Sequence, residues 1–244
     1  MVSEVVIVGT LILAGLIRGY TGFGFSGLMI VALSIFYPVA DLVPAILLVD
    51  LFISLPLVAT CWKQADFTIL TPLLWATMLG IPFGLGLLYA LSDELLKVLV
   101  PSTILTLAFL SRHPSLVIQK LSQSKLLCGF TSGWTTSAVS SGGTPVVMYM
   151  RQQALSNSVK RASLICYFFL VNCLAVGGNY TITKQWAMLP SNPVIYVLIA
   201  FLSALAGRRL FIYKDFESIH EVAFYLLLTV SSGTLIIAVW SLFS

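Results

Sequence analysis

Long apolar stretches alternate with short polar connections along this chain of 244 residues. Six of these stretches are long enough to cross about 30 Å of hydrocarbon as α-helices that rise 1.5 Å per residue. They are Leu42–Trp62, Phe67–Leu91, Leu95–Leu110, Ala162–Tyr180, Asn192–Gly207 and Val222–Phe243. The pattern therefore predicts an all-α polytopic membrane protein.

Two further apolar regions are interrupted by polar, glycine-containing segments. Val5–Val39 breaks at RGYTGFGFSG, and Leu126–Met150 breaks at GWTTSAVSSGGTP. Each interruption is expected to leave flanking helices of about 8–13 residues, or roughly 12–20 Å, which is near half a membrane. Each region either crosses the bilayer as one interrupted helix or forms a re-entrant hairpin that returns to its starting side.

The basic residues favour hairpins, because Lys and Arg concentrate on the cytoplasmic side of membrane proteins. If both regions cross, seven basic residues face one side and five the other, with Arg18 inside the membrane. If both are hairpins, ten share one side and only Lys97 and Lys184 face the other. The ten are Lys63, Arg112, Lys120, Lys125, Arg151, Lys160, Arg161, Arg208, Arg209 and Lys214. We therefore expect six crossings and two re-entrant hairpins, with both termini outside.

A hairpin plus three crossings is an odd unit, so the second unit enters the membrane upside down relative to the first. The chain then divides into a first transmembrane repeat (1–111), a cytoplasmic linker (112–125) and a second repeat (126–244). GLIRGYTG in the first repeat and GFTSGWTT in the second share G-x-x-x-G, an aromatic residue and a threonine. Inverted repeats are a common architecture of secondary transporters, and we expect the two repeats to move against each other.

Composition supports the bilayer as the main solvent. The chain is 59% hydrophobic and 9% charged, whereas soluble domains carry about 25% charged residues. The net charge of +4 does not indicate nucleic-acid binding, because the basic residues are scattered at segment ends. The first residues lack a signal-peptide pattern and are expected to belong to the mature fold.

No enzyme signature is present: the chain lacks G-x-S-x-G, H-E-x-x-H and Walker motifs, and we expect no cofactor. The two histidines lie near segment ends, which argues against a metal site. The four cysteines form no C-x-x-C pair and are interpreted as free thiols. They are Cys61, Cys128, Cys166 and Cys173.

The two interruptions hold the candidate chemistry. Non-helical backbone at membrane depth is stable only when it is buried in protein or lines a watery cavity. Hairpins from opposite faces bring their tips together near the midplane, and the second arm of each points a helix N-terminus into this space. Glycines allow close approach of the backbone, and Ser and Thr supply hydroxyl donors. Together with Arg18, these groups predict an electropositive site for a small anion.

The predicted substrate-binding residues lie at the tips and on the adjoining helices. They are Arg18, Tyr20, Thr21, Gly22, Phe23, Gly24, Phe25, Ser26, Trp134, Thr135, Thr136, Ser140, Ser141, Gly142, Gly143, Thr144 and Asn172. Arg18 either contacts the ligand or is structural, through pairing with Asp50 or capping of helix carbonyls. Asp50 is a candidate coupling residue or an ion-pair partner. Asn172 either lines the site or makes an interhelical hydrogen bond. The simpler interpretation of the aromatic residues is packing, and that of the hydroxyl residues is capping of backbone groups.

Three stretches carry a resemblance to a known family. LAGLIRGYTGFGFSGLMIVALSIFYP and ADFTILTPLLWATMLGIPFGLGLLYALSDELLKVLV resemble the first half of TauE/SafE sulfite exporter family permeases. GGTPVVMYMRQQALSNSVKRASLICYFFLVN resembles the matching motif of their second half. The resemblance implies a multi-pass permease of the bacterial cytoplasmic (inner) membrane that moves sulfite, organosulfonates or related small anions.

The chain departs from that family at two places. Ile30, Val31 and Ala32 follow the first glycine motif where many members carry proline, and Thr144 replaces the first proline of a G-G-P-P-like turn. An added hydroxyl at a helix N-terminus could tune the choice of anion. The alternatives to a sulfur-anion permease are a passive anion channel, a permease for a small carboxylate, and a membrane scaffold. Homodimers are common among transporters, and no segment here stands out as an interface.

Overall fold

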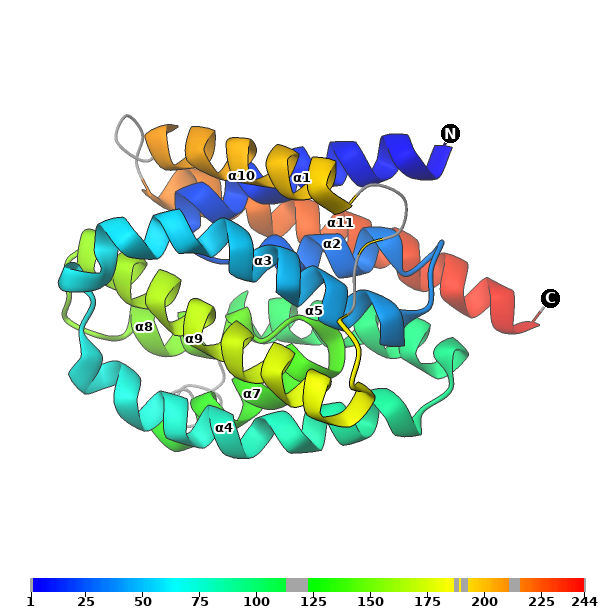
Figure 1. Ribbon diagram of the computed structural model, residues 1–244, viewed down its shortest axis with the longest axis horizontal. Coiled ribbons are helices and arrows are strands. Elements are labelled where there is room, and N and C mark those ends of the chain that lie inside the picture. The colour runs from blue at the N-terminus through cyan, green and yellow to red at the C-terminus, as the bar shows by residue number, and fades with distance from the viewer. Residues whose placement is uncertain (1, 113–122, 187–188, 190–192, 211–215, 244) are drawn as a thin grey trace.

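All regular structure in the described residues is helical (Figure 1). The computed structural model describes residues 2–112, 123–186, 189, 193–210 and 216–243. The helices are α1 (Val2–Thr21), α2 (Phe25–Leu33), α3 (Val39–Cys61), η1 (Trp62–Gln64), α4 (Phe67–Ala90), α5 (Asp93–Arg112), α7 (Lys125–Val139), α8 (Gly143–Arg151), α9 (Asn157–Thr183), α10 (Pro193–Leu210) and α11 (Phe216–Phe243). Most of the predicted linker 112–125 lies outside the described residues.

One helix corresponds to each of the six predicted crossings: α3, α4, α5, α9, α10 and α11. Among the described residues, α1, α3, α4, α5, α9 and α10 are each long and apolar enough to span a membrane. The described apolar part of α11 is shorter, Tyr225–Trp240. Large apolar side chains such as Trp75, Phe83, Val194 and Trp240 are exposed on the outside of the bundle. Lipid is the solvent that suits this surface.

The first arm of each interrupted region is longer than predicted. Helix α1 has 20 residues and α7 has 15, against an expected 8–13. The prediction was wrong because it treated the glycines near the end of α1 as helix breakers. Gly15 and Gly19 instead remain helical and face α10 so closely that a methyl group on either would collide with it. Gly129 and Gly133 of α7 face α4 in the same way, as expected for small residues at membrane helix interfaces.

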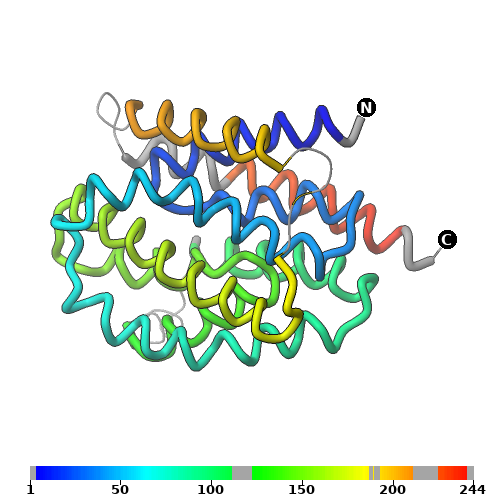
Figure 2. Tube along the Cα trace, in the orientation of Figure 1, coloured from blue at the N-terminus to red at the C-terminus, as the bar shows by residue number. Residues whose placement is uncertain are grey.

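The chain turns sharply at both interruptions. Gly22 and Gly24 have φ angles of 85° and 94°, which side chains rarely adopt, and α2 begins directly after them. In the second interruption Ser140 adopts φ 53°, and α8 begins at Gly143. Both second arms have nine residues, or about 14 Å. Figures 1 and 2 show α2 running back opposite to α1, and α8 running back opposite to α7.

The two ends of the bundle differ in charge. Both chain termini lie at one end, here called the terminal end (Figure 1). The α3–α4 connection with Lys63, the end of α8 with Arg151 and the end of α10 with Arg208 lie at the opposite end, here called the basic end. Lys184 follows the last turn of α9 at the terminal end.

Helices of the two sequence halves are interleaved. The most extensive packing joins α4 to α7 and α1 to α10, so each first arm is held by a helix of the other half. We call α1, α2, α3, α10 and α11 body A, and α4, α5, α7, α8 and α9 body B. Most contacts fall within a body, and the main contacts between bodies are α3 with α9 and α5 with α11. The central seam between α3 and α9 includes a buried, hydrogen-bonded polar pair, Asp50 of α3 and Asn172 of α9.

Candidate functional site

A small cavity of about 50 Å³ lies where the two interruptions meet. Its lining comes from α1, α2, α3 and α11 of body A and from α7, α8 and α9 of body B. The lining residues are Arg18, Phe23, Gly24, Ser26, Gly27, Asp50, Thr136, Ser140, Ser141, Gly142, Gly143, Thr144, Phe168, Asn172 and Leu227. At about 10–15 Å³ per water-sized sphere, the cavity has room for roughly three to five waters or one compact oxyanion.

An ion pair between α1 and α3, both in body A, forms one wall. The Nε atom of Arg18 lies 3.0 Å from Oδ1 of Asp50, and both side chains are almost fully buried. This contact lacks the alignment of a linear hydrogen bond. The other carboxylate oxygen accepts hydrogen bonds from Asn172 Nδ2 at 2.9 Å and Ser26 Oγ at 3.2 Å. Asp50 therefore ties α1, α2 and α9 together at one point.

Arg18 also fixes the first interruption. Its Nη1 donates to the carbonyl of Gly22, and its Nη2 donates to Ser54 Oγ at 2.7 Å. Its guanidinium carbon lies 5.7 Å from the ring centroid of Phe168, within range of a cation–π interaction. The pairing with Asp50 that the sequence offered as one alternative is present, and the side chain still lines the cavity.

The opposite wall contains a buried hydroxyl without a partner. Thr136 Oγ1 is buried and makes no hydrogen bond, although most buried hydroxyls are paired. The backbone of Gly142 approaches this hydroxyl so closely that a β-carbon there would overlap it. Ser132 Oγ holds the turn by donating to Gly142 O at 2.7 Å. A ligand in the cavity is a natural partner for the Thr136 hydroxyl.

Two helix N-termini complete the lining. Gly24 caps α2, and Ser26 and Gly27 in its first turn line the cavity. Gly143 and Thr144 are the first two residues of α8 and line it from the other side. The first N–H groups of a helix have no acceptor within the helix and carry partial positive charge. Backbone donors therefore converge on the cavity from both bodies.

Six predicted residues lie outside the lining. Tyr20 and Phe25 are buried in packing, and Thr21 hydrogen-bonds to the carbonyls of Ile17 and Phe23. Gly22 accepts the bond from Arg18, and Thr135 donates to Thr131 O within α7. Trp134 is 40% exposed on the outer surface of the bundle. The other predicted residues, Asp50 included, line the cavity.

Sequence reasoning missed three lining residues. Phe168 lies one helical turn before Asn172 on α9, so the same-face spacing could have indicated it. Gly27 adjoins Ser26, which was predicted. Leu227 belongs to a uniformly apolar stretch of α11, and nothing in its local pattern distinguishes it from its lipid-facing neighbours.

A second and larger cavity of about 360 Å³, the vestibule, opens near the terminal end. The start of α3, the ends of α4 and α9, and the segment after α9 form its wall. The wall includes exposed residues such as Asp41, Gln185 and Trp186, with the Trp186 ring stacked on Tyr180. From Ala45 to Asp50 along α3 is about 8 Å, so the vestibule and the central cavity lie in sequence along the seam.

Comparison with protein families matches residues 7–235 to the family described as Sulfite exporter TauE/SafE. This range contains both interruptions, the central ion pair and the described apolar part of α11 as far as residue 235. The chain belongs to the TauE/SafE family. Comparison with curated proteins and with solved structures gave no match. This TauE/SafE chain is therefore a multi-pass membrane transport protein, and its apolar helices agree with that class.

Proposed function

We propose that this protein is a secondary transporter that moves a small sulfur oxyanion, such as sulfite or a compact sulfonate, across the bacterial cytoplasmic membrane. The anion binds in the central cavity between the two interruptions. The family description, Sulfite exporter TauE/SafE, suggests that the anion is sulfite or a chemically related species. The observation that carries the proposal is the convergence of the unpartnered Thr136 hydroxyl, Arg18 and two helix N-termini on one buried space.

The charge balance of the site supports a coupling role for Asp50. With Arg18 and Asp50 both ionised, the pair is neutral, and a buried anion adds an uncompensated negative charge that is costly at low dielectric. A proton on Asp50 removes that cost, because Arg18 then faces the anion alone. The anion therefore binds together with a proton, and Asn172 and Ser26 hold the carboxyl group in place.

Two observations support re-entrant hairpins and inverted repeats. The helices of residues 1–111 run opposite to their counterparts in 126–244 along the long axis (Figures 1 and 2). In the second observation, α1 is exchanged with α7, α2 with α8, α3 with α9, α4 with α10 and α5 with α11. This exchange maps the α4–α7 contact onto α1–α10, and it maps α3–α9 and α5–α11 each onto itself. The basic end is then the cytoplasmic end, with both termini outside.

Alternating access is proposed to come from motion of body A against body B. The sequence suggested that the two repeats move as units, but α1 packs on α10 and α7 on α4, across the repeats. These glycine-lined contacts are too close to separate without large loss of packing. The α3–α9 and α5–α11 seams are the surfaces along which the bodies can rock, and the central cavity lies in the first of them.

The test is anion binding and transport by purified protein. A thermal-shift screen uses sulfite, thiosulfate, taurine and sulfoacetate, with acetate and chloride as controls. Binding at 100 times Kd stabilises by about 2.7 kcal/mol, which for a chain of this size raises Tm by roughly 5–10 °C. A protein that no sulfur anion stabilises, and that carries none into proteoliposomes, refutes the proposal.

Matched variants locate the site. Thr136→Val removes the cavity hydroxyl, and Thr135→Val removes the neighbouring hydroxyl that bonds within its own helix. Loss of one hydrogen bond to an anion weakens binding by about 10–100-fold, so Thr136→Val is expected to bind weakly and Thr135→Val normally. Arg18→Lys is expected to retain part of the binding that Arg18→Ala loses. Equal affinity in both threonine variants contradicts the assignment.

A passive anion channel is the rival function, and Asp50 separates the two. Transport by the proposed mechanism saturates and responds to a pH gradient. Asp50→Asn is expected to abolish that response and leave counterflow exchange. If anion flux does not saturate and does not depend on pH in either the parent protein or Asp50→Asn, the channel is favoured.

A further inference from the structure

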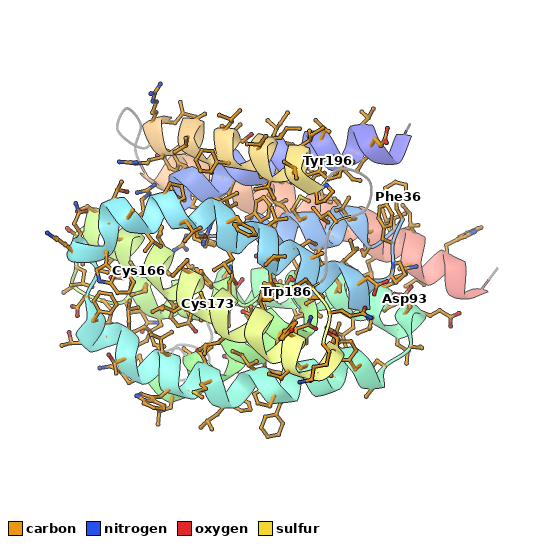
Figure 3. All side chains as sticks on the ribbon, viewed as in Figure 1. Phe36, Asp93, Cys166, Cys173, Trp186 and Tyr196 are labelled. Carbon is orange, nitrogen blue, oxygen red and sulfur yellow. The ribbon has the colours of Figure 1, made fainter. Side chains whose placement is uncertain are left out.

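The two ends of the α3–α9 seam are in different states. At the terminal end the bodies leave the 360 Å³ vestibule between them. At the basic end the same helices are in contact: the Cys61 thiol of α3 lies 4.0 Å from the carbonyl oxygen of Ala162 on α9, and Cys61 and Cys166 are both buried. Figure 3 shows Cys166 toward the basic end of the bundle and Asp93 at the opposite end. The seam is therefore open toward one side of the membrane and closed toward the other.

Arg161 makes a polar connection between the bodies at the closed end. It lies in the second turn of α9, in body B, and is 9% exposed. Its Nε donates to the carbonyl of Tyr20 at 2.7 Å, and its Nη2 donates to the carbonyl of Gly19. Both acceptors lie in the last turn of α1, in body A, directly before the interruption. The Arg161 side chain of body B is thus hydrogen-bonded to the same end of α1 that carries Arg18.

These acceptors suit a bond that forms and breaks. The last carbonyls of a helix have no donor within the helix and must be satisfied by side chains or by water. When the bodies part at the basic end, water can solvate both the carbonyls and the guanidinium, so separation leaves no buried group unpaired. A guanidinium can hold both carbonyls at once, which a lysine ammonium does with poorer geometry.

We propose that Arg161 is the latch of the cytoplasmic gate: its bonds to Gly19 and Tyr20 hold the transporter closed at the basic end, and they break when that end opens. The proposal rests on the alternating access proposed above. Arg161 acts through α1 and does not touch the anion, so it is a positioning residue. Its loss shifts the protein toward the state that is open at the basic end.

Cys166 is a native reporter of this gate, because its side chain is fully buried in the seam. In a background with Cys61, Cys128 and Cys173 changed to alanine, Cys166 is the single thiol. Inside-out and right-side-out membrane vesicles are treated with a membrane-impermeant maleimide, and the labelling rate is measured. Arg161→Ala is expected to raise the labelling rate of Cys166 about tenfold, and only from the basic end. The loss of one net hydrogen bond from a charged group increases the population of the state open at that end by about this factor.

Two further variants separate a gate from a structural cap. Arg161→Lys is expected to restore part of the slow labelling. Arg209→Ala, which removes an exposed cation from the same end, is expected to label like the parent. Lower Tm in Arg161→Ala with unchanged labelling, or equal labelling from both sides, overturns the proposal. Labelling needs no substrate, so these outcomes are independent of whether a sulfur anion is transported.

Discussion

The contact between α1 and α10 gives the sharpest test of how the two sequence halves are joined. A β-carbon built on Gly19 would lie 2.7 Å from the carbonyl carbon of Ala204 and would overlap its oxygen. Ordinary contacts of a β-carbon begin at 3.4 Å, so Gly19→Ala must part the helices by at least about 0.7 Å. The neighbouring atoms are backbone of α10 and have no rotamer through which to move aside.

A gap of this size forfeits a quarter to a half of the dispersion energy of the atoms that lose contact. Overpacking of a close contact costs about 1–3 kcal/mol, and a rigid helix pair falls at the upper end of that range. We therefore expect Gly19→Ala to cost about 3 kcal/mol, which for this chain length lowers Tm by roughly 6–12 °C.

Gly9 provides the matched control within the same helix. A β-carbon there meets nothing within 4 Å, so Gly9→Ala adds helix propensity without a clash. It is expected to gain about 0.5–1 kcal/mol and to raise Tm by a few degrees. Unfolding of both variants in detergent is followed by circular dichroism. If Gly19→Ala melts within 2 °C of Gly9→Ala, as a rough margin of measurement, the close α1–α10 contact is refuted.

Two further predictions concern the central cavity and the start of α4. Gly142→Ala places a methyl group onto the Thr136 hydroxyl and is expected to abolish the rise in Tm that a bound sulfur anion produces, whereas Gly177→Ala, with open space around it, keeps that rise. Asp66 caps α4, and its hydrogen bonds from the Thr68 hydroxyl and from the backbone N–H groups of Ile69 and Thr68 lower its pKa. Its stabilisation is present above the unfolded pKa of about 3.9 and is lost as pH falls through the lower folded value. A plot of Tm against pH should therefore fall less steeply below about pH 4 in Asp66→Asn, which keeps a capping oxygen but does not titrate; equal acid limbs would contradict this assignment.

The membrane-spanning helices could be predicted because their length and apolarity are local properties of the sequence. The lengths of the first arms of the interruptions could not be predicted, because a glycine can either end a helix or allow close contact with a neighbouring helix. Only the partner helix decides, and the partner of α1 is almost the whole chain away. The pairing of α1 with α10 and of α4 with α7 is absent from any local pattern.

The polar half of the cavity was predictable because polar residues are costly in apolar segments and need a reason to be there. Arg18, Asp50 and Thr136 were found in this way. Trp134 was placed near the site because it adjoins the interruption in sequence. Residues two apart on a helix point about 200° apart, so Trp134 faces outward when Thr136 faces the cavity.

The interleaving of the two bodies also constrains how the protein is made. Body A needs α10 and α11, which leave the ribosome last, and body B needs α4 and α5 from the first half. While the second half is being synthesised, the glycine face of α1 has no partner and must wait in lipid or against the translocation machinery. Body A cannot be completed before α10 and α11 are inserted, so the bundle is finished only when nearly the whole chain has been synthesised. A chain that ends before α10 leaves α1, which leads into the first interruption, without its main partner.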